Sequence, residues 1–246
     1  MTERRFRVAP GVLDAERVEL TGDEARHVRV MRLDVGDAVG LFDGVGGAAR
    51  GVLEAVSADR VSVRVVAREA TAAEAPVSVT LVQAVPVKFQ RLDTTARLCT
   101  ELGVARIVPV VSAHTQVPPG GVRIIGKRAE RWRRIVEAAA KQSGRAVVPP
   151  IDEPVAFADL PWDQLPTARF LLTLTATVSL REALAQAPAS DCAVLVGPEG
   201  GWTAAEEAAA ADYGCVAVAL GPRVLRADSA APVALSLVQS AWGDLR

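Results

Sequence analysis

The sequence predicts an α/β protein with a small N-terminal β-barrel, followed by a larger domain built on a mostly parallel sheet. The N-terminal part, up to about residue 70, holds short valine-rich runs separated by turn residues. After it, apolar runs alternate with amphipathic helical stretches. Late in the chain, two apolar runs that flank one helix each end at a glycine-rich turn. We therefore expect two domains, residues 1–72 and residues 73–246, joined near a small, polar stretch at 71–75.

The N-terminal domain is predicted as a small barrel because several short strands follow one another with turn signals between them. The expected strands are 5–8, 17–20, 38–42, 50–56 and 60–67. A short helix is expected at 23–31. Three arginines lie near His27 and would supply hydrogen-bond donors to a nucleic acid, namely Arg26, Arg29 and Arg32. A generic β module without that role is the other interpretation.

The second domain is predicted from alternating strands and helices, with glycines placed where helices end. The expected strands are 77–85, 104–111, 168–174, 192–196 and 215–220. The expected helices are 90–102, 128–143, one that begins after Thr203, and a last one capped by Asp228 or Ser229 that runs to Trp242. Thr203 and Glu206 form the T-x-x-E pattern of a capping box. A polar, proline-rich loop is expected at 114–121.

The two late glycine turns are the predicted cofactor site. One is Gly197-Pro-Glu-Gly-Gly201, and the other is Gly221-Pro-Arg-Val-Leu-Arg226. Both follow an apolar run, and glycine at the carboxyl end of a parallel strand lets the backbone approach a ligand closely. Tight turns without a ligand are the alternative interpretation.

The helix at 128–143 carries a strong local excess of cations. Trp132 lies on its apolar face and is expected in the core rather than as a base-stacking platform. Two acids, Glu130 and Glu137, face eight cations in and around it. These cations are Arg123, Lys127, Arg128, Arg131, Arg133, Arg134, Lys141 and Arg145. A phosphate-contact surface and a solvated helix face both fit this pattern.

Composition excludes several classes of protein. The 246 residues carry a net charge of −1, so bulk charge does not indicate a nucleic-acid partner. No run of apolar residues is long enough for a membrane span, and the N-terminus lacks a secretory stretch, so we expect a cytoplasmic protein.

Three scattered cysteines are expected as buried free thiols, and no metal-ligand spacing occurs. The dinucleotide, P-loop and nucleophilic-serine motifs are all missing.

Five segments together resemble one known family. LVGPEGGWTAAEEAAA and LGPRVLRADSAAPVAL resemble the signature segments of the bacterial 16S ribosomal RNA (uracil-N3)-methyltransferases, in the SPOUT superfamily of S-adenosylmethionine-dependent enzymes. TELGVARIVPVVS, RAERWRRIVEAAAKQSGRAVVPPI and HVRVMRLDVGD resemble upstream segments of that family. In the last signature segment, Ala227, Asp228 and Ser229 stand where the family usually has threonine, glutamate and threonine.

The resemblance implies a PUA-like, RNA-binding barrel and a methyltransferase domain with a deep trefoil knot. It also implies a homodimer acting on 16S ribosomal RNA of the small ribosomal subunit, without a metal or a membrane. Three knot loops would bind S-adenosylmethionine. The implied contacts are Leu172, Thr173, Leu174, Val196, Gly197, Pro198, Gly200, Gly201, Leu220, Gly221, Val224, Leu225, Arg226 and Ser229. The RNA contacts predicted from the basic segments described above are Arg26, Arg29, Arg32, Arg128, Arg131, Arg134 and Arg145.

Three residues are candidates for catalysis. Uracil N3 must lose its proton for methyl transfer, and negative charge then spreads onto the base carbonyl oxygens. Arg226 is predicted to stabilise that charge, or alternatively to anchor a phosphate. Glu199 would accept a hydrogen bond, or favour the next helix by its charge. Asp228 would accept the proton, or cap its helix. Methylation of another RNA, and a non-catalytic assembly factor, are the alternative functions.

Overall fold

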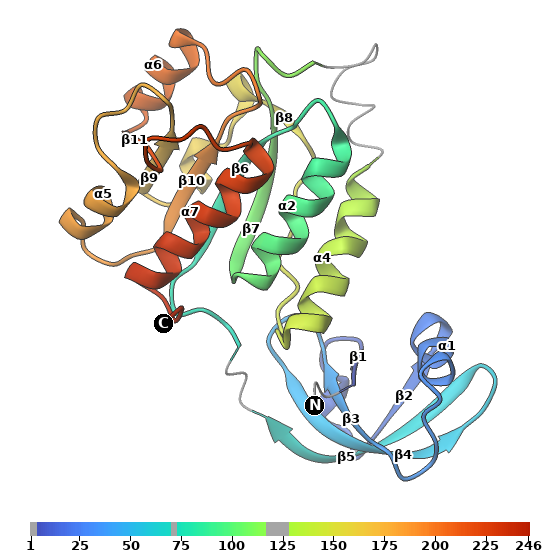
Figure 1. Cartoon of the computed structure of the whole chain (residues 1–246). Coiled ribbons are helices and arrows are strands. Elements are labelled where there is room, and N and C mark those ends of the chain that lie inside the picture. Colours follow the sequence, from blue (N-terminus) through green and yellow to red (C-terminus); the bar gives the residue numbers. More distant parts are fainter. Residues whose placement is uncertain (1–3, 70–72, 117–127) are drawn as a thin grey trace. The chain divides into compact units, whose positions relative to one another are not determined.

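The computed structural model describes residues 4–69, 73–116 and 128–246, and divides into two compact units (Figure 1). Unit 1 comprises Met1–Glu74 and Ala140–Val148, and unit 2 comprises Ala75–Ala139 and Pro149–Arg246. The end of helix α4 (Ala129–Ser143) therefore belongs to unit 1. Arg123, Lys127, most of the predicted loop at 114–121 and part of the predicted linker at 71–75 lie outside the described residues.

Unit 1 is a five-stranded mixed sheet. Its strands are β1 (Arg5–Arg7), β2 (Arg17–Thr21), β3 (Ala38–Phe42), β4 (Ala48–Val56) and β5 (Arg60–Glu69). They lie in the order β1-β3-β4-β5-β2, and only β1 and β3 are parallel. Among the described residues β1 and β2 each pair on one side only. The sheet is therefore a half-barrel, not the closed barrel that the strand count predicts.

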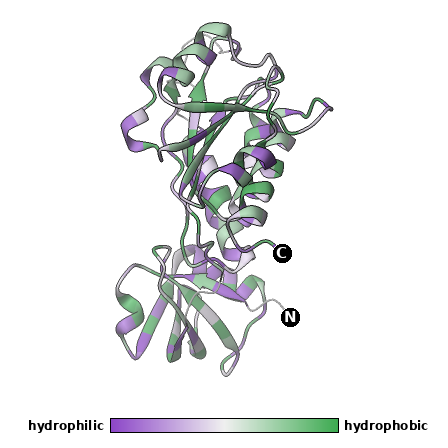
Figure 2. Ribbon diagram, turned by 90° about the vertical axis from the view of Figure 1, so that its left-hand side faces the viewer, coloured by the Kyte–Doolittle hydropathy of each residue, from purple (hydrophilic) through white to green (hydrophobic). Residues whose placement is uncertain are grey.

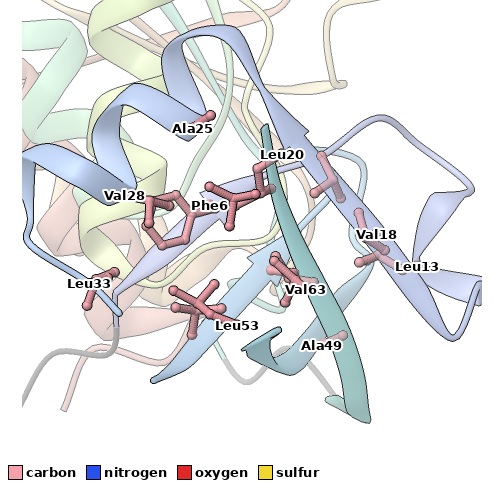
Figure 3. Packing of buried hydrophobic residues seen from close by; sticks show 14 residues of the cluster. Phe6, Leu13, Val18, Leu20, Ala25, Val28, Leu33, Ala49, Leu53 and Val63 are labelled. Carbon is pink, nitrogen blue, oxygen red and sulfur yellow. The ribbon is translucent and has the colours of Figure 1, made fainter. Parts of the chain in front are cut away.

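Helix α1 (Gly22–Val30) packs against one face of this sheet (Figure 3). Its Ala25 and Val28 are fully buried in one cluster with Phe6, Leu20 and Leu53. Register shifts in β4 at Arg50/Gly51 and Leu53/Ala55 mark bulges, which bend a strand and increase its twist. A curved sheet closed by one short helix buries a core without a complete ring of strands.

Unit 2 is a six-stranded sheet in which every pair is parallel, as predicted. Its strands are β6 (Val79–Ala84), β7 (Val104–Val111), β8 (Val155–Ala156), β9 (Ala168–Leu172), β10 (Cys192–Val196) and β11 (Cys215–Val218). The order is β11-β9-β10-β6-β7-β8. In Figure 2 the central strands are mostly hydrophobic, whereas the helices carry hydrophilic residues between apolar ones. Strands covered on both faces have this continuous apolar character.

Helices cover both faces of that sheet. They are α2 (Phe89–Glu101), α4, α5 (Leu180–Gln186), α6 (Ala204–Asp212) and α7 (Ala227–Ala241). Helices α2 and α7 pack against each other (Figure 1). Each follows a strand of the sheet, so both begin at its carboxyl edge. Helix α5 and strand β8 were not predicted, although Ser179 and Glu182 form a complete capping box at the start of α5.

The predicted helix ends agree with the structure, with one exception at the start of α7. Thr203 and Glu206 form the capping box of α6, and Gly214 follows that helix with φ of 78°. The prediction that Asp228 or Ser229 caps α7 is wrong. Arg226 occupies the N-cap with extended backbone, and no side chain caps the helix. Alanine at 227 enters the first turn readily, which places Asp228 inside that turn, where a carboxylate favours the positive helix end.

The remaining expectations about the core agree with the structure. Trp132 is fully buried. The three cysteines are free thiols; Cys99 and Cys192 are buried and Cys215 is half-buried. Burial raises the pKa of Cys192 to about 12 and that of Cys215 to about 11, so neither forms a reactive thiolate near neutral pH. No helix in the described part of the chain is long and apolar enough to cross a membrane.

Candidate site at the carboxyl edge of the parallel sheet

Three loops leave the sheet side by side, after β9, β10 and β11. In the sheet, Leu172 pairs with Val196 on one side and with Val218 on the other. The Thr173 N–H then donates to the Val218 carbonyl at 3.0 Å. Because carboxyl ends of parallel strands meet at one edge, the three loops form a continuous surface there.

The glycines of the β10 loop are required by geometry. The Gly201 N–H donates to the Pro198 carbonyl at 2.9 Å, and Gly201 has φ of 71°, where residues with a side chain are strained. A Cβ on Gly197 would lie 3.3 Å from the Trp202 ring. A Cβ on Gly200 would lie 3.1 Å from that of His114. Neighbouring side chains therefore crowd Gly197 and Gly200, whereas Gly201 is favoured by its backbone conformation.

All residues predicted to contact the cofactor lie on these three loops, at the adjoining strand ends or in the first turn of α7. Leu174 and Val224 are each 75% exposed, an unusual state for large apolar side chains. Val196 and Pro198 are buried, whereas Leu220 and Leu225 are half-buried. The others are Leu172, Thr173, Gly197, Gly200, Gly201, Gly221, Arg226 and Ser229. These assignments stay predictions.

Glu199 is held by the segment that leads into α2. Its carboxylate accepts a hydrogen bond from the Val87 N–H at 3.3 Å and pairs with the Arg91 guanidinium. Both side chains of the ion pair are about three-quarters buried. This arrangement fixes the turn after β10 against the start of α2. The Glu199 carboxylate, which the sequence predicted to accept a hydrogen bond from a ligand, is therefore already bonded within the protein.

Arg226 and Asp228 lie at the start of α7. The Arg226 Nη2 donates to Asp228 Oδ2 at 2.8 Å. The arginine side chain is 65% exposed and that of Asp228 is 14% exposed. The other oxygen, Asp228 Oδ1, is buried and has no hydrogen-bond partner in the described part of the chain. A buried carboxylate oxygen without a partner costs free energy, which a ligand that donates a hydrogen bond to it would recover.

An open cleft of about 750 Å³ lies between the starts of α2 and α7. It is lined by Lys88, Gln90, Arg91, Thr94, Arg226 and Asp228. Sequence reasoning missed Lys88 and Arg91. A cation at the N-cap and another in the first turn are unfavourable next to the positive end of a helix. That anomaly is the sequence signal that would have identified them.

The basic helix α4 has less free charge than its sequence indicates. The count from the sequence set these cations against acids on the helix alone, whereas the fold also brings in acids from other segments. Arg131 pairs with Asp93, Arg133 with Glu153, Arg134 with Glu130, Lys141 with Glu24, and Arg145 with Glu74. Arg128 lies over the Phe89 ring at 4.5 Å. Arg131 and Arg134 keep 61% and 75% of their side chains exposed, so an RNA contact by them stays a prediction.

Arg145 departs from its prediction. Its side chain is 4% exposed, and its Nε and Nη2 donate to Glu74 Oε2 at 3.1 and 2.9 Å. The guanidinium points into unit 1, contrary to the phosphate contact that its place in a basic segment predicts. By contrast Arg26, Arg29 and Arg32 are exposed on and just after α1, and their RNA contacts stay predictions.

Comparison with known proteins agrees with this arrangement. Residues 73–239 match the model of an RNA methyltransferase domain, and residues 20–66 match an RNA methyltransferase PUA domain. The ribosomal RNA small subunit methyltransferase E of Mycobacterium tuberculosis is 37% identical over 88% of this chain and 84% of its own length. The chain belongs to the ribosomal RNA small subunit methyltransferase E family. The family predicted from the signature segments is thereby confirmed.

Two further members of the methyltransferase E family support the alignment along the whole chain. The Bacillus subtilis protein is 31% identical over 92% of this chain and 90% of its own length. The crystal structure of the Neisseria gonorrhoeae methyltransferase E, bound to S-adenosyl methionine, is 32% identical and superposes with a TM-score of 0.90. That match covers 99% of this chain and all of the other. No group of three metal-binding side chains occurs among the described residues.

Proposed function

We propose that this chain transfers a methyl group from S-adenosylmethionine to N3 of a specific uridine in 16S ribosomal RNA of the small subunit, in the cytoplasm. Membership of the methyltransferase E family supports the reaction and the ribosomal RNA substrate. The donor bound in the Neisseria structure supports the cofactor. The observation that carries the proposal is the set of three adjacent loops, with a glycine turn that has open space at Gly201.

The loops suit the methyl donor. Leu174 and Val224, both largely exposed, offer apolar surface to the faces of an adenine ring, and backbone N–H and C=O groups can bind its edge. We further propose that the segment after Leu220 threads a loop formed earlier in the chain, which makes the trefoil knot. When bound, S-adenosylmethionine supplies a methyl group on a positively charged sulfur, a strong electrophile.

The protein residues would activate the uracil. Asp228 Oδ1, buried and unpaired in the described chain, accepts the proton from N3, whose lone pair then becomes the nucleophile. Arg226 holds the other carboxylate oxygen and has most of its guanidinium exposed, so it can donate to a uracil carbonyl oxygen as charge develops there. Glu199 is engaged by Arg91 and Val87, so we assign it to positioning the turn.

RNA binding and dimerisation complete the proposal. The PUA-domain match and the exposed Arg26, Arg29 and Arg32 support an RNA-binding unit 1. On α7, Val233 is 39% exposed and offers apolar surface to a second copy. We propose a homodimer in which unit 1 of one subunit presents RNA to the methyltransferase domain of the other. A monomer would leave that surface in solvent.

The decisive experiment is a methylation assay on small ribosomal subunits from cells that lack this enzyme. We expect one methyl group on one 16S uridine, located at N3 by mass mapping of RNA fragments. Methylation of transfer RNA or of another ribosomal site instead would favour a different substrate for the same chemistry. Calorimetry that detects no binding of S-adenosylmethionine would favour a non-catalytic assembly factor.

A matched pair of glycine substitutions tests the cofactor loop. Gly201 and Gly214 have φ of 71° and 78°, and an added Cβ would meet nothing within 4 Å at either position. Alanine should therefore cost each variant about 1–2 kcal/mol of stability from backbone strain. Only Gly201→Ala should also weaken S-adenosylmethionine binding, by about tenfold, because it disturbs the Pro198–Gly201 turn. Thermal melts and calorimetry measure both effects; equal cofactor affinity in the two variants would contradict the loop assignment.

A further inference from the structure

Every residue that lines the cleft between α2 and α7 carries a polar or charged group. Its lining contains three cations, Lys88, Arg91 and Arg226, against the single carboxylate of Asp228. Gln90 and Thr94 add neutral hydrogen-bonding groups. A cleft whose lining residues all carry polar or charged groups, with cations in excess, suits an anion.

Lys88 provides charge that the protein itself does not compensate. Its side chain is exposed, and the ammonium group has no hydrogen bond or ion pair with any residue that the structure describes, although the Lys88 carbonyl accepts from the Arg91 N–H at 2.9 Å. It also makes no cap for α2, so its side chain has no evident structural role. This contrasts with α4, where Arg131, Arg133 and Arg134 all have acidic partners. The uncompensated cation of Lys88 therefore lies in a cleft, where it can act on a ligand.

The cleft adjoins the proposed reaction centre through two of its own residues. Arg226 and Asp228 line it, and Arg91 pairs with Glu199 of the glycine turn. A uracil whose N3 meets Asp228 brings its own sugar and phosphates into the same neighbourhood. We propose that this cleft binds a backbone phosphate of the RNA at the target uridine, with Lys88 and Arg91 as its cationic contacts. The inference rests on the proposed function and names the substrate group bound at that site.

A second anion needs to be distinguished, namely the carboxylate of the methionine part of the donor. Both are singly charged oxyanions, and lysine and arginine bind either. Phosphate contacts have a separate signature, because each one releases counterions from the RNA. For single strands the plot of log affinity against log salt concentration has a slope of about −0.7 for each contact. Donor binding in the absence of RNA tests the carboxylate directly.

The test compares Lys88→Ala with Lys88→Arg and with Arg181→Ala. The last variant removes an exposed cation from α5 that does not line the cleft. We expect Lys88→Ala to raise the KM for RNA about tenfold, as expected for a lost phosphate contact, and to make the salt slope of RNA binding shallower by about 0.7. Lys88→Arg should restore both, and Arg181→Ala should change neither. Affinity for S-adenosylmethionine alone should stay at the wild-type value in all three.

Two results would overturn the inference. One is a salt slope and RNA KM in Lys88→Ala that match those of Arg181→Ala. The other is weaker binding of S-adenosylmethionine alone, which would assign the cleft to the donor carboxylate. Failure of the proposed function looks different, since wild-type protein would then leave small subunits unmethylated. The salt slope is measured by binding to a 16S fragment and needs no turnover, so it tests the cleft in either case.

Discussion

Replacing Asp228 by asparagine is expected to lower kcat by about 10²–10⁴-fold, the contribution of a well-placed general base. Asparagine has the same shape, and its amide oxygen can still accept from Arg226, so the start of α7 should persist. What it loses is the ability of Oδ1, buried and without a partner in the described chain, to take a proton from N3. Single-turnover methylation at saturating donor, with calorimetry for S-adenosylmethionine, separates this loss from a loss of binding.

Asp212→Asn is the matched control, since it neutralises an exposed carboxylate at the end of α6 outside the cleft. It should keep the wild-type rate. In Asp228→Asn the residual rate should rise with pH, because uracil that ionises in solution no longer needs a base on the protein. A kcat within about twofold of wild type, a change worth only about 0.4 kcal/mol, would show that Asp228 is not the proton acceptor.

Local patterns in the sequence predicted most of the second domain, because the forces that define those elements act between near neighbours. The apolar runs that became β7 and β10 have the bounds predicted for them. The capping box at Thr203 and the glycine after α6 act within one turn of helix, so they could be recognised directly. The N-cap of α7 was predicted at Asp228 or Ser229, two or three residues after its observed place at Arg226. Sequence patterns fix the ends of helices only to within a few residues.

The electrostatics of the site were beyond sequence reasoning because the partners are distant in the chain. Glu199 forms an ion pair with Arg91, and Arg145 forms one with Glu74. In both pairs the partners are far apart in the sequence and are brought together only by the fold. Counting charges along α4 therefore overstated its basic surface. Lys88 was missed as well: its place at the N-cap of α2 is an anomaly visible in the sequence, but the cleft around it appears only in the fold. The half-barrel is a similar case, since strand count alone does not decide whether the edges of a sheet meet.

Glu74→Ala is expected to destabilise the protein by about 3–5 kcal/mol, the range for breaking a buried ion pair from one side. The Glu74 carboxylate accepts from the Arg145 guanidinium and from the backbone N–H groups of Ala146 and Val147, both at 2.9 Å. The Arg145 side chain is 4% exposed and that of Glu74 is 23% exposed, so the loss of Glu74 leaves a largely buried guanidinium without its carboxylate. Urea denaturation followed by circular dichroism measures the change in the free energy of unfolding.

Glu19→Ala is the control within the same unit, since Glu19 pairs with Arg60 at 3.1 Å and both side chains are at least half exposed. Its loss should cost no more than about 1 kcal/mol, as for other surface pairs. Glu74→Gln keeps one acceptor oxygen and the shape, so it should fall between the two. If Glu74→Ala were no more destabilising than Glu19→Ala, the ion pair between Glu74 and Arg145 would contribute little to the stability of the protein. Arg145 would then be available to bind RNA, as its place in a basic segment predicts.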